Sequence, residues 1–122
     1  MKGYTTLGTN DLASSSKFYD ELLSGMGGSR VMENDRMVMW STGEDKPMIA
    51  VLKPFDGELA TSGNGVMLGI SCDSRDVVDE MHAKALSLGA DDEGAPGNRT
   101  EAFYGGYFRD LDGNKLVFFK TG

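Results

Sequence analysis

The sequence predicts an α+β fold built from two paired βαβββ modules within one domain of 122 residues. Three observations predict it. The segment that starts at Tyr4 and the segment that starts at Met67 share one pattern at an offset of 63 residues, so that Leu7 falls on Ile70. Each segment has a strand, a capped helix and a glycine stop, and short strand candidates follow each helix. Neither half can bury both faces of its sheet alone, so the halves must pair.

The first strand and helix are predicted from periodicity and capping. Residues Tyr4–Thr9 alternate as a strand does. Asp11 suits a helix N-cap, because its carboxylate accepts hydrogen bonds from the free amides of the first turn. The glycines at 25, 27 and 28 end the helix. Its apolar stripe consists of Leu12, Phe18, Tyr19, Leu22, Leu23 and Met26.

The remaining strands of the first module are separated by turn residues. Strands are predicted over Arg30–Glu33 and Met37–Trp40, on either side of a turn at Asn34-Asp35. A third follows over Met48–Leu52. Residues 1–53 thus form the first module, 54–65 a linker and 66–122 the second module.

The second module repeats this order. A strand is predicted over Val66–Cys72, followed by a helix that Asp73 or Ser74 caps and Gly89 ends. The buried stripe of that helix contains Val77, Val78, Met81, Ala85 and Leu88. Three strands follow: a weakly specified one near Ala90–Asp92, then Phe103–Arg109 and Leu116–Phe119, with the turn signal Asp110–Asn114 between the last two.

The composition excludes several classes of function. Lys and Arg total 12, Asp and Glu total 19, and the net charge is −7. Nucleic acids and anionic membranes are bound by clustered cations, which this balance disfavours. No stretch approaches the roughly 18–20 apolar residues that a membrane span needs, and the N-terminus has no apolar core of a secretory signal. The single cysteine, Cys72, cannot form an internal disulfide. We therefore expect a cytoplasmic protein.

Two stretches of the sequence form recognisable motifs: Tyr4-Thr-Thr-Leu-Gly-Thr-Asn-Asp11-Leu12 with Lys17-Phe18-Tyr19, and Phe108-Arg-Asp110-Leu-Asp112-Gly113-Asn114. The first resembles the first strand and helix of the vicinal oxygen chelate superfamily, which contains glyoxalases, bleomycin-resistance proteins and extradiol dioxygenases. The second resembles the closing turn of that family, with Leu111 in place of the usual proline. The resemblance covers almost the whole chain. It implies paired βαβββ modules around a cleft, usually in a homodimer.

The resemblance also implies a divalent metal ion. This sequence departs from the family at the positions of the metal ligands. The positions that match the family's ligands are Tyr4, Ala50, Met67 and Val117. Alanine and valine have no donor atom, and the methionine thioether suits soft ions. The single histidine, His82, falls on the second predicted helix, where we expect a partly buried or surface residue. We therefore predict no metal and no other cofactor.

If the matched positions still face a cleft, other residues line it. Small residues leave volume, and tyrosine and methionine offer polarizable, mostly apolar contact, which favours a flat or apolar organic ligand with a few polar groups. Tyr107 is preferred to Tyr104, because residues three apart point to opposite faces of a strand. The predicted ligand-binding residues are Tyr4, Thr6, Trp40, Met67, Ser71, Arg99, Tyr107 and Val117.

Some of these residues, and several other polar residues of the chain, also suit a purely structural role. Trp40 also suits packing in the core or between subunits. The segment Gly94–Arg99 is interpreted as a loop, which is either a lid that brings Arg99 to an anionic ligand or a plain surface connection. Cys72 is expected to be an inert core thiol, and Asp110 and Asp112 to satisfy turn amides.

Three functions remain open at this point. The first is a metal-free protein that binds a small organic molecule in the cleft, as bleomycin-resistance proteins do. The second is a lyase-like or dioxygenase-like enzyme that uses a metal at other positions or tyrosine acid–base chemistry. The third is a structural or regulatory dimer whose cleft is filled by side chains. The lack of metal ligands favours the first. The sequence leaves open the identity of the ligand and whether the modules pair within a chain or between chains.

Overall fold

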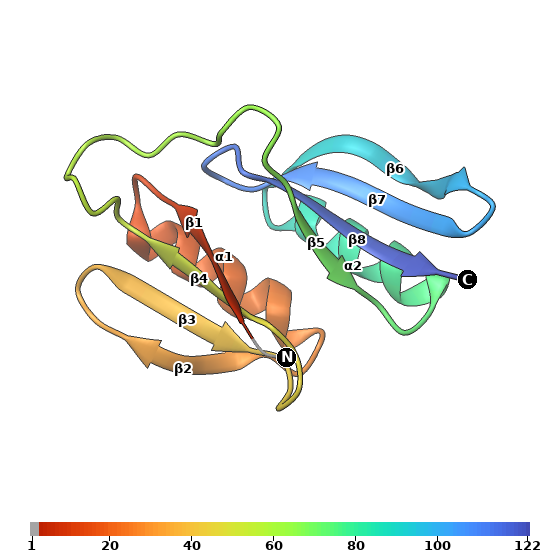
Figure 1. The fold of residues 1–122 in the computed structure, drawn as a ribbon, viewed down its shortest axis with the longest axis horizontal. Helices are drawn as coiled ribbons and strands as arrows, with labels where there is room; N and C mark the ends of the chain where they lie inside the picture. The colour runs from red at the N-terminus through yellow and green to blue at the C-terminus, as the bar shows by residue number, and fades with distance from the viewer. Residues whose placement is uncertain (1–2) are drawn as a thin grey trace. The chain divides into compact units, whose positions relative to one another are not determined.

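The computed structural model describes residues 3–122, which form two compact units (Figure 1). The first unit extends to Ser62 and the second begins at Gly63. The boundary between them falls within the predicted linker, residues 54–65. Within the described residues, no helix has the length and apolar character needed to cross a membrane.

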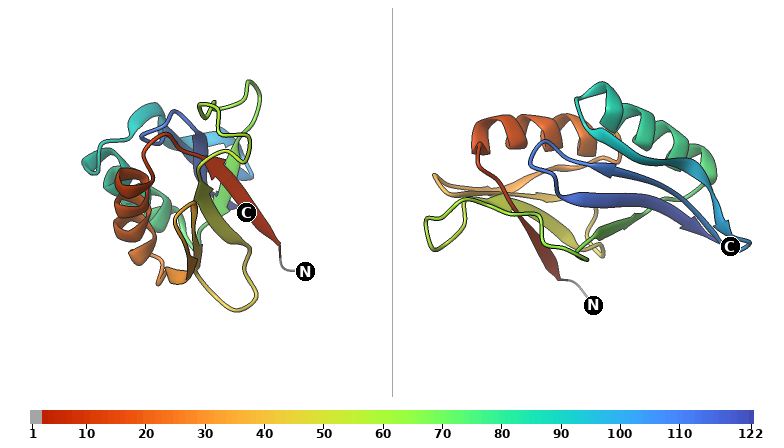
Figure 2. Two further views of the ribbon diagram at one scale, coloured as in Figure 1. Left: turned by 90° about the vertical axis from the view of Figure 1, so that its left-hand side faces the viewer. Right: turned by 90° about the horizontal axis from the view of Figure 1, so that it is seen from above.

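The first unit is a four-stranded sheet with one helix on one of its faces (Figure 2). The strands lie in the order β1-β4-β3-β2; β1 and β4 are parallel and the other neighbours are antiparallel. Helix α1 contacts β2, β3 and β4. The bounds are β1 (Tyr4–Gly8), α1 (Leu12–Ser24), β2 (Ser29–Glu33), β3 (Met37–Ser41) and β4 (Met48–Leu52).

The second unit repeats this architecture with the strand order β5-β8-β7-β6. Here β5 and β8 are parallel, and helix α2 contacts β6, β7 and β8. The bounds are β5 (Leu68–Ser71), α2 (Arg75–Ser87), β6 (Asp91–Thr100), β7 (Phe103–Arg109) and β8 (Lys115–Thr121). The α+β class and the repeated βαβββ order are therefore confirmed, and we call the uncovered face of each sheet its helix-free face.

Both helices begin at the polar residues that capping predicts. The Ser14 amide donates to Asp11 Oδ1 over 3.1 Å, and the Val77 amide donates to Ser74 Oγ over 3.2 Å. Ser74, rather than Asp73, is therefore the cap of α2. Helix α1 ends at Ser24, so Met26 lies beyond it, and β5 begins two residues after Val66.

The segment Gly94–Arg99 is a strand, and its interpretation as a loop or lid is wrong. It belongs to β6, which pairs antiparallel with β7 through three register shifts. The backbone hydrogen bonds to β7 hold these residues extended although they contain two glycines and a proline. Because β6 is an edge strand, the missing amide of Pro96 breaks no interior ladder.

The turn between β7 and β8 is held by one buried carboxylate. Asp110 is 4% exposed, and its Oδ1 accepts hydrogen bonds from the amides of Asp112 and Asn114, each over 2.9 Å. Its Oδ2 accepts a third from Asn114 Nδ2 over 3.0 Å. Gly113 takes the left-handed conformation, with φ of 86°. The prediction that Asp110 satisfies turn amides is confirmed.

Part of the predicted linker is attached to the first unit. Asn10 Oδ1 accepts a hydrogen bond from the Ala60 amide over 2.8 Å, and its Nδ2 donates to the Ala60 carbonyl over 3.3 Å. A Cβ on Gly8 would lie 3.0 Å from the Ala60 Cβ. The segment thus crosses the end of β1, where the small glycine lets it approach closely.

Candidate functional site

The helix-free face of the first unit contains the first-module residues that the family resemblance aligned with metal ligands. Thr6 pairs with Ala50, and Ala50 pairs with Met39 on β3. Tyr4 shares this face by alternation and is 61% exposed. Ala50 is fully buried. The exposed part of this face is therefore formed by β1 and by Met32 of β2, which pairs with Met39 and is 40% exposed.

The helix-free face of the second unit is defined by a row of three paired residues. Gly69 pairs with Val117, and Val117 pairs with Tyr107. Tyr104 lies on the other face, where its hydroxyl donates to Asp79 Oδ1 of α2 over 2.6 Å. This hydrogen bond raises the pKa of Tyr104, because the carboxylate stabilises the protonated phenol. The two tyrosines therefore point to opposite faces, as their spacing predicts.

Two glycines surround Val117 on this face. A Cβ on Gly69 would lie 3.1 Å from the Phe119 ring, and a Cβ on Gly105 would lie 3.1 Å from Val117 Cγ2 and 2.9 Å from the Phe103 ring. The rings of Phe103 and Phe119 stack with centroids 5.3 Å apart. The two glycines thus leave room for the stacked rings. Val117 lies next to both glycines, and its side chain is only 1% exposed.

Tyr107 is accompanied by two cations. The Arg99 guanidinium lies 5.1 Å from the centroid of its ring, and Lys115 Nζ lies 5.5 Å from it. Arg99 is positioned by hydrogen bonds that it donates to the carbonyls of Gly97 and Ala95, over 3.0 and 2.8 Å. The structure therefore brings together two predicted site residues, Arg99 and Tyr107, with Lys115, which the sequence analysis missed. The signal was available, since Lys115 precedes Val117 by two and shares its face.

An ion pair lies next to these cations. Arg109 Nε donates to Glu93 Oε1 over 2.5 Å, and Arg109 Nη1 donates to the Gly113 carbonyl over 3.0 Å. The hydrogen bond and charge of Arg109 lower the pKa of Glu93, with a smaller contribution from Lys115. Glu93 is thus engaged by Arg109. Arg99 and Lys115 form no ion pair within residues 3–122.

Trp40 lies on the opposite face of its sheet from Tyr4, and its assignment to the cleft is wrong. It is 1% exposed and packs against Tyr19 of α1, with ring centroids 5.7 Å apart. Its indole Nε1 donates to Asp20 Oδ1 over 2.9 Å. The hydrogen bonds from Arg30 and Trp40 hold the pKa of Asp20 below its ordinary value, against the opposing effect of burial. A tryptophan with an apolar ring partner and one hydrogen-bond acceptor suits this core position.

The other predicted site residues lie in exposed places. Met67 is 46% exposed and directly precedes β5, where alternation places it on the face of Gly69. Ser71 is exposed on β5 opposite Phe119. Thr6 is exposed on β1. Whether these residues contact a ligand stays a prediction.

The donor atoms present do not fit the divalent ion that the resemblance implies. Of the four matched positions, Ala50 and Val117 are buried and have no donor, which leaves the phenol of Tyr4 and the thioether of Met67. Across residues 3–122, no cluster of three or more His, Cys, Asp or Glu side chains is arranged to hold a metal. A hard or borderline ion needs three or more oxygen, nitrogen or thiolate ligands.

His82 lies on the helix side of the second sheet, where its side chain contacts two oxygen atoms. It is 4% exposed, and its Nε2 lies 3.0 Å from the Tyr107 carbonyl oxygen and 3.2 Å from Asp92 Oδ1. Two acceptors around one nitrogen place a proton there, so that atom is a donor. A Cβ on Gly106 would lie 3.0 Å from the imidazole. His82 therefore hydrogen-bonds to the Tyr107 carbonyl from the helix side of the sheet. Its side chain is more buried than the sequence predicted.

Comparison with known proteins gives one consistent family. The model of the Glyoxalase/Bleomycin resistance protein/Dioxygenase superfamily matches residues 3–118. No curated protein is significantly similar to the chain.

Solved structures agree with this family. A glyoxalase/bleomycin resistance protein from Albidiferax ferrireducens T118 is 32% identical, with a TM-score of 0.89 over 100% of this chain and 98% of that one. A glyoxalase/bleomycin resistance protein/dioxygenase family enzyme from Burkholderia phytofirmans PsJN is 20% identical, with a TM-score of 0.80 over 98% and 97%. Lactoylglutathione lyase from Agrobacterium tumefaciens is 20% identical, with a TM-score of 0.72 over 96% and 90%. The match over residues 3–118, together with the fold, means that the chain belongs to the Glyoxalase/Bleomycin resistance protein/Dioxygenase superfamily.

Proposed function

We propose that this protein binds a small organic anion with a flat apolar body, and that it does so without a metal ion. The single observation that carries the proposal is the pair of cations, Arg99 and Lys115, on the ring of Tyr107. On a chain with a net charge of −7, this local excess of positive charge is a site for a carboxylate or a similar anionic group.

The same face supplies a surface for the rest of such a ligand. The stacked rings of Phe103 and Phe119 and the backbone of two glycines adjoin Val117, which pairs with Tyr107. The two rings lie over the glycines, so the half-buried ring pair is the apolar surface that a ligand can reach, and ring faces favour stacking. A flat apolar body on these rings with its anionic group near Arg99 uses both features.

The binding test uses 2-naphthoate as the probe, with the uncharged 2-naphthamide as its comparison. We expect 2-naphthoate to bind more tightly than the amide, and Arg99→Gln to weaken 2-naphthoate binding about three- to tenfold, as loss of one charge-assisted contact at an exposed site does. Calorimetric titration measures both.

Lys120→Gln is the matched control, because Lys120 is on the same strand as Lys115 but pairs with Tyr104 in the register. It should bind 2-naphthoate as the unsubstituted protein does. Equal affinity for the acid and the amide, or an equal loss in Arg99→Gln and Lys120→Gln, would contradict the proposal.

The metal-free part of the proposal has its own test. The purified protein is expected to contain far less than one divalent ion per chain by elemental analysis, and EDTA is expected to leave its melting temperature unchanged. A structural or catalytic ion would contribute to folding, so its removal would lower that temperature. One tightly held ion per chain would instead favour the alternative function, a lyase-like or dioxygenase-like enzyme.

A homodimer and a cytoplasmic location belong to the same proposal. Several large apolar side chains are exposed in a chain of this size, and they support association with a second copy. They include Tyr4, Val31, Phe55, Leu59, Val66 and Met67. The sequence has one cysteine, Cys72, which is buried and has no second cysteine in the chain with which to form a disulfide, and this suits a reducing compartment.

A further inference from the structure

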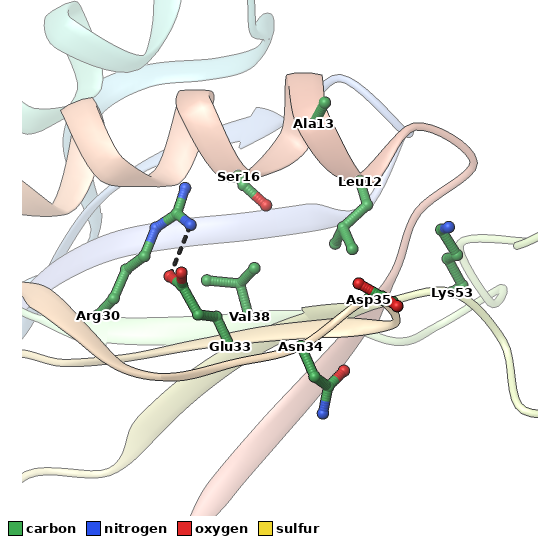
Figure 3. Close-up of a pocket in the computed structure, with 9 residues that line it drawn as sticks. All are labelled: Leu12, Ala13, Ser16, Arg30, Glu33, Asn34, Asp35, Val38 and Lys53. Atoms are coloured by element: carbon green, nitrogen blue, oxygen red, sulfur yellow. Dashed lines mark hydrogen bonds and ion pairs between the residues drawn. The ribbon is translucent and has the colours of Figure 1, made fainter.

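A cavity lies in the first unit, on the helix side of its sheet. It has a volume of about 620 Å³ and opens between α1 and the hairpin of β2 and β3 (Figure 3). Pockets for small molecules are commonly of this size. Its apolar walls come from Leu12 of α1 and Val38 of β3, whose side chains point toward each other across the cavity.

The hydroxyl of Ser16 points into this cavity (Figure 3). Ser16 is 4% exposed, and its Oγ is a buried oxygen without a hydrogen-bond partner among the described residues (Figure 3). Its position four residues after Leu12 and three before Tyr19 places it on the buried side of α1. A buried hydroxyl without a partner destabilises a fold, and alanine would suit a helix better there. Ser16 is therefore unexplained by folding alone.

Two exposed side chains of opposite charge, Asp35 and Lys53, lie at one end of the cavity. Within residues 3–122, no hydrogen bond or ion pair involves the side chain of Asp35 or of Lys53, although both line the cavity (Figure 3). Arg30 at the other end is engaged, since it forms ion pairs with Asp20 and Glu33, each at 2.8 Å. The free charges are thus gathered at the end formed by Asp35 and Lys53.

From these features we infer that the cavity binds a small zwitterion, namely an α-amino acid whose aliphatic chain ends in a hydrogen-bonding group. Its carboxylate faces Lys53 and its ammonium faces Asp35. Its methylene groups lie against Leu12 and Val38, and its terminal group reaches Ser16 Oγ. This arrangement gives the buried hydroxyl a hydrogen-bond partner and places each charged group of the ligand beside an exposed side chain of opposite charge.

The test uses the full chain and L-glutamine as the probe, followed by amide chemical shifts in an NMR titration. We expect shifts around Ser16, Val38 and Asp35. Ser16→Ala should weaken L-glutamine binding about three- to tenfold, as loss of one neutral hydrogen bond does. L-norleucine, which has no terminal polar group, should bind the unsubstituted protein and Ser16→Ala equally well. Glutaramate, which lacks the ammonium group, should bind more weakly than L-glutamine.

Matched variants separate binding from folding. Ser15→Ala changes a neighbouring buried serine that does not line the cavity, and Lys46→Gln removes an exposed lysine elsewhere in the unit. Both should bind L-glutamine normally, whereas Lys53→Gln should weaken it about three- to tenfold. Ser16→Ala should melt at the same or a higher temperature. Absence of shifts around Ser16, or a Ser16→Ala protein that melts lower and binds L-glutamine normally, would overturn the proposal.

Discussion

Replacing Trp40 with alanine is expected to destabilise the protein by about 3–5 kcal/mol, the usual cost of removing a fully buried aromatic side chain. Trp40 is 1% exposed, packs against Tyr19 and donates its indole hydrogen to Asp20. The substitution leaves a cavity between β3 and α1 and removes one of the hydrogen bonds to the Asp20 carboxylate. Urea unfolding followed by circular dichroism measures the loss in the free energy of unfolding.

Trp40→Phe is the matched control for that experiment. It keeps an aromatic ring beside Tyr19 and loses the indole donor and part of the volume, so it should cost about 1–2 kcal/mol. Asp20 retains its hydrogen bonds from Arg30 in both variants. If Trp40→Ala kept the stability of the unsubstituted protein, the assignment of Trp40 to the core would fail and a place in a ligand site would again be open.

Replacing Asp110 with alanine is expected to cost about 2–4 kcal/mol. Its buried carboxylate accepts hydrogen bonds from two amides and from the Asn114 side chain, and alanine would leave these donors unpaired. An unpaired buried donor costs about 1–3 kcal/mol. The loss should also loosen the β7–β8 hairpin. Hydrogen exchange at the amides of Asp112 and Asn114, together with the free energy of unfolding, measures both effects.

Two further variants make the Asp110 result specific. Asp110→Asn keeps one acceptor oxygen and should lose less stability than alanine. Asp45→Ala removes an exposed carboxylate from the loop before β4 and should change the free energy of unfolding by less than about 0.5 kcal/mol. A similar loss in Asp110→Ala and Asp45→Ala would mean that the turn does not depend on the buried carboxylate.

Features of this chain that depend on local hydrogen bonds were predictable from the sequence, and those that depend on distant partners were not. The caps at Asp11 and Ser74 and the turn at Asp110 were predictable, because each depends on hydrogen bonds between residues two to four apart. The strand predicted near Ala90–Asp92 is the start of β6, but its continuation over Gly94–Arg99 was not predictable, because that segment has no alternation and is extended through pairing with β7. Trp40 was misplaced because its helix partners, Tyr19 and Asp20, lie about twenty positions away.

The sequence alone determined the repeated βαβββ order, the helix caps and the lack of donor atoms at the positions that match the family's metal ligands. These properties depend on local hydrogen bonding, on periodicity and on residue identity, which a sequence contains directly. Only the tertiary structure decided that Arg99 and Lys115 meet at the ring of Tyr107 and that the Ser16 hydroxyl is buried without a partner among residues 3–122. Those properties depend on strand register and on packing between distant segments, which set the surroundings of each side chain.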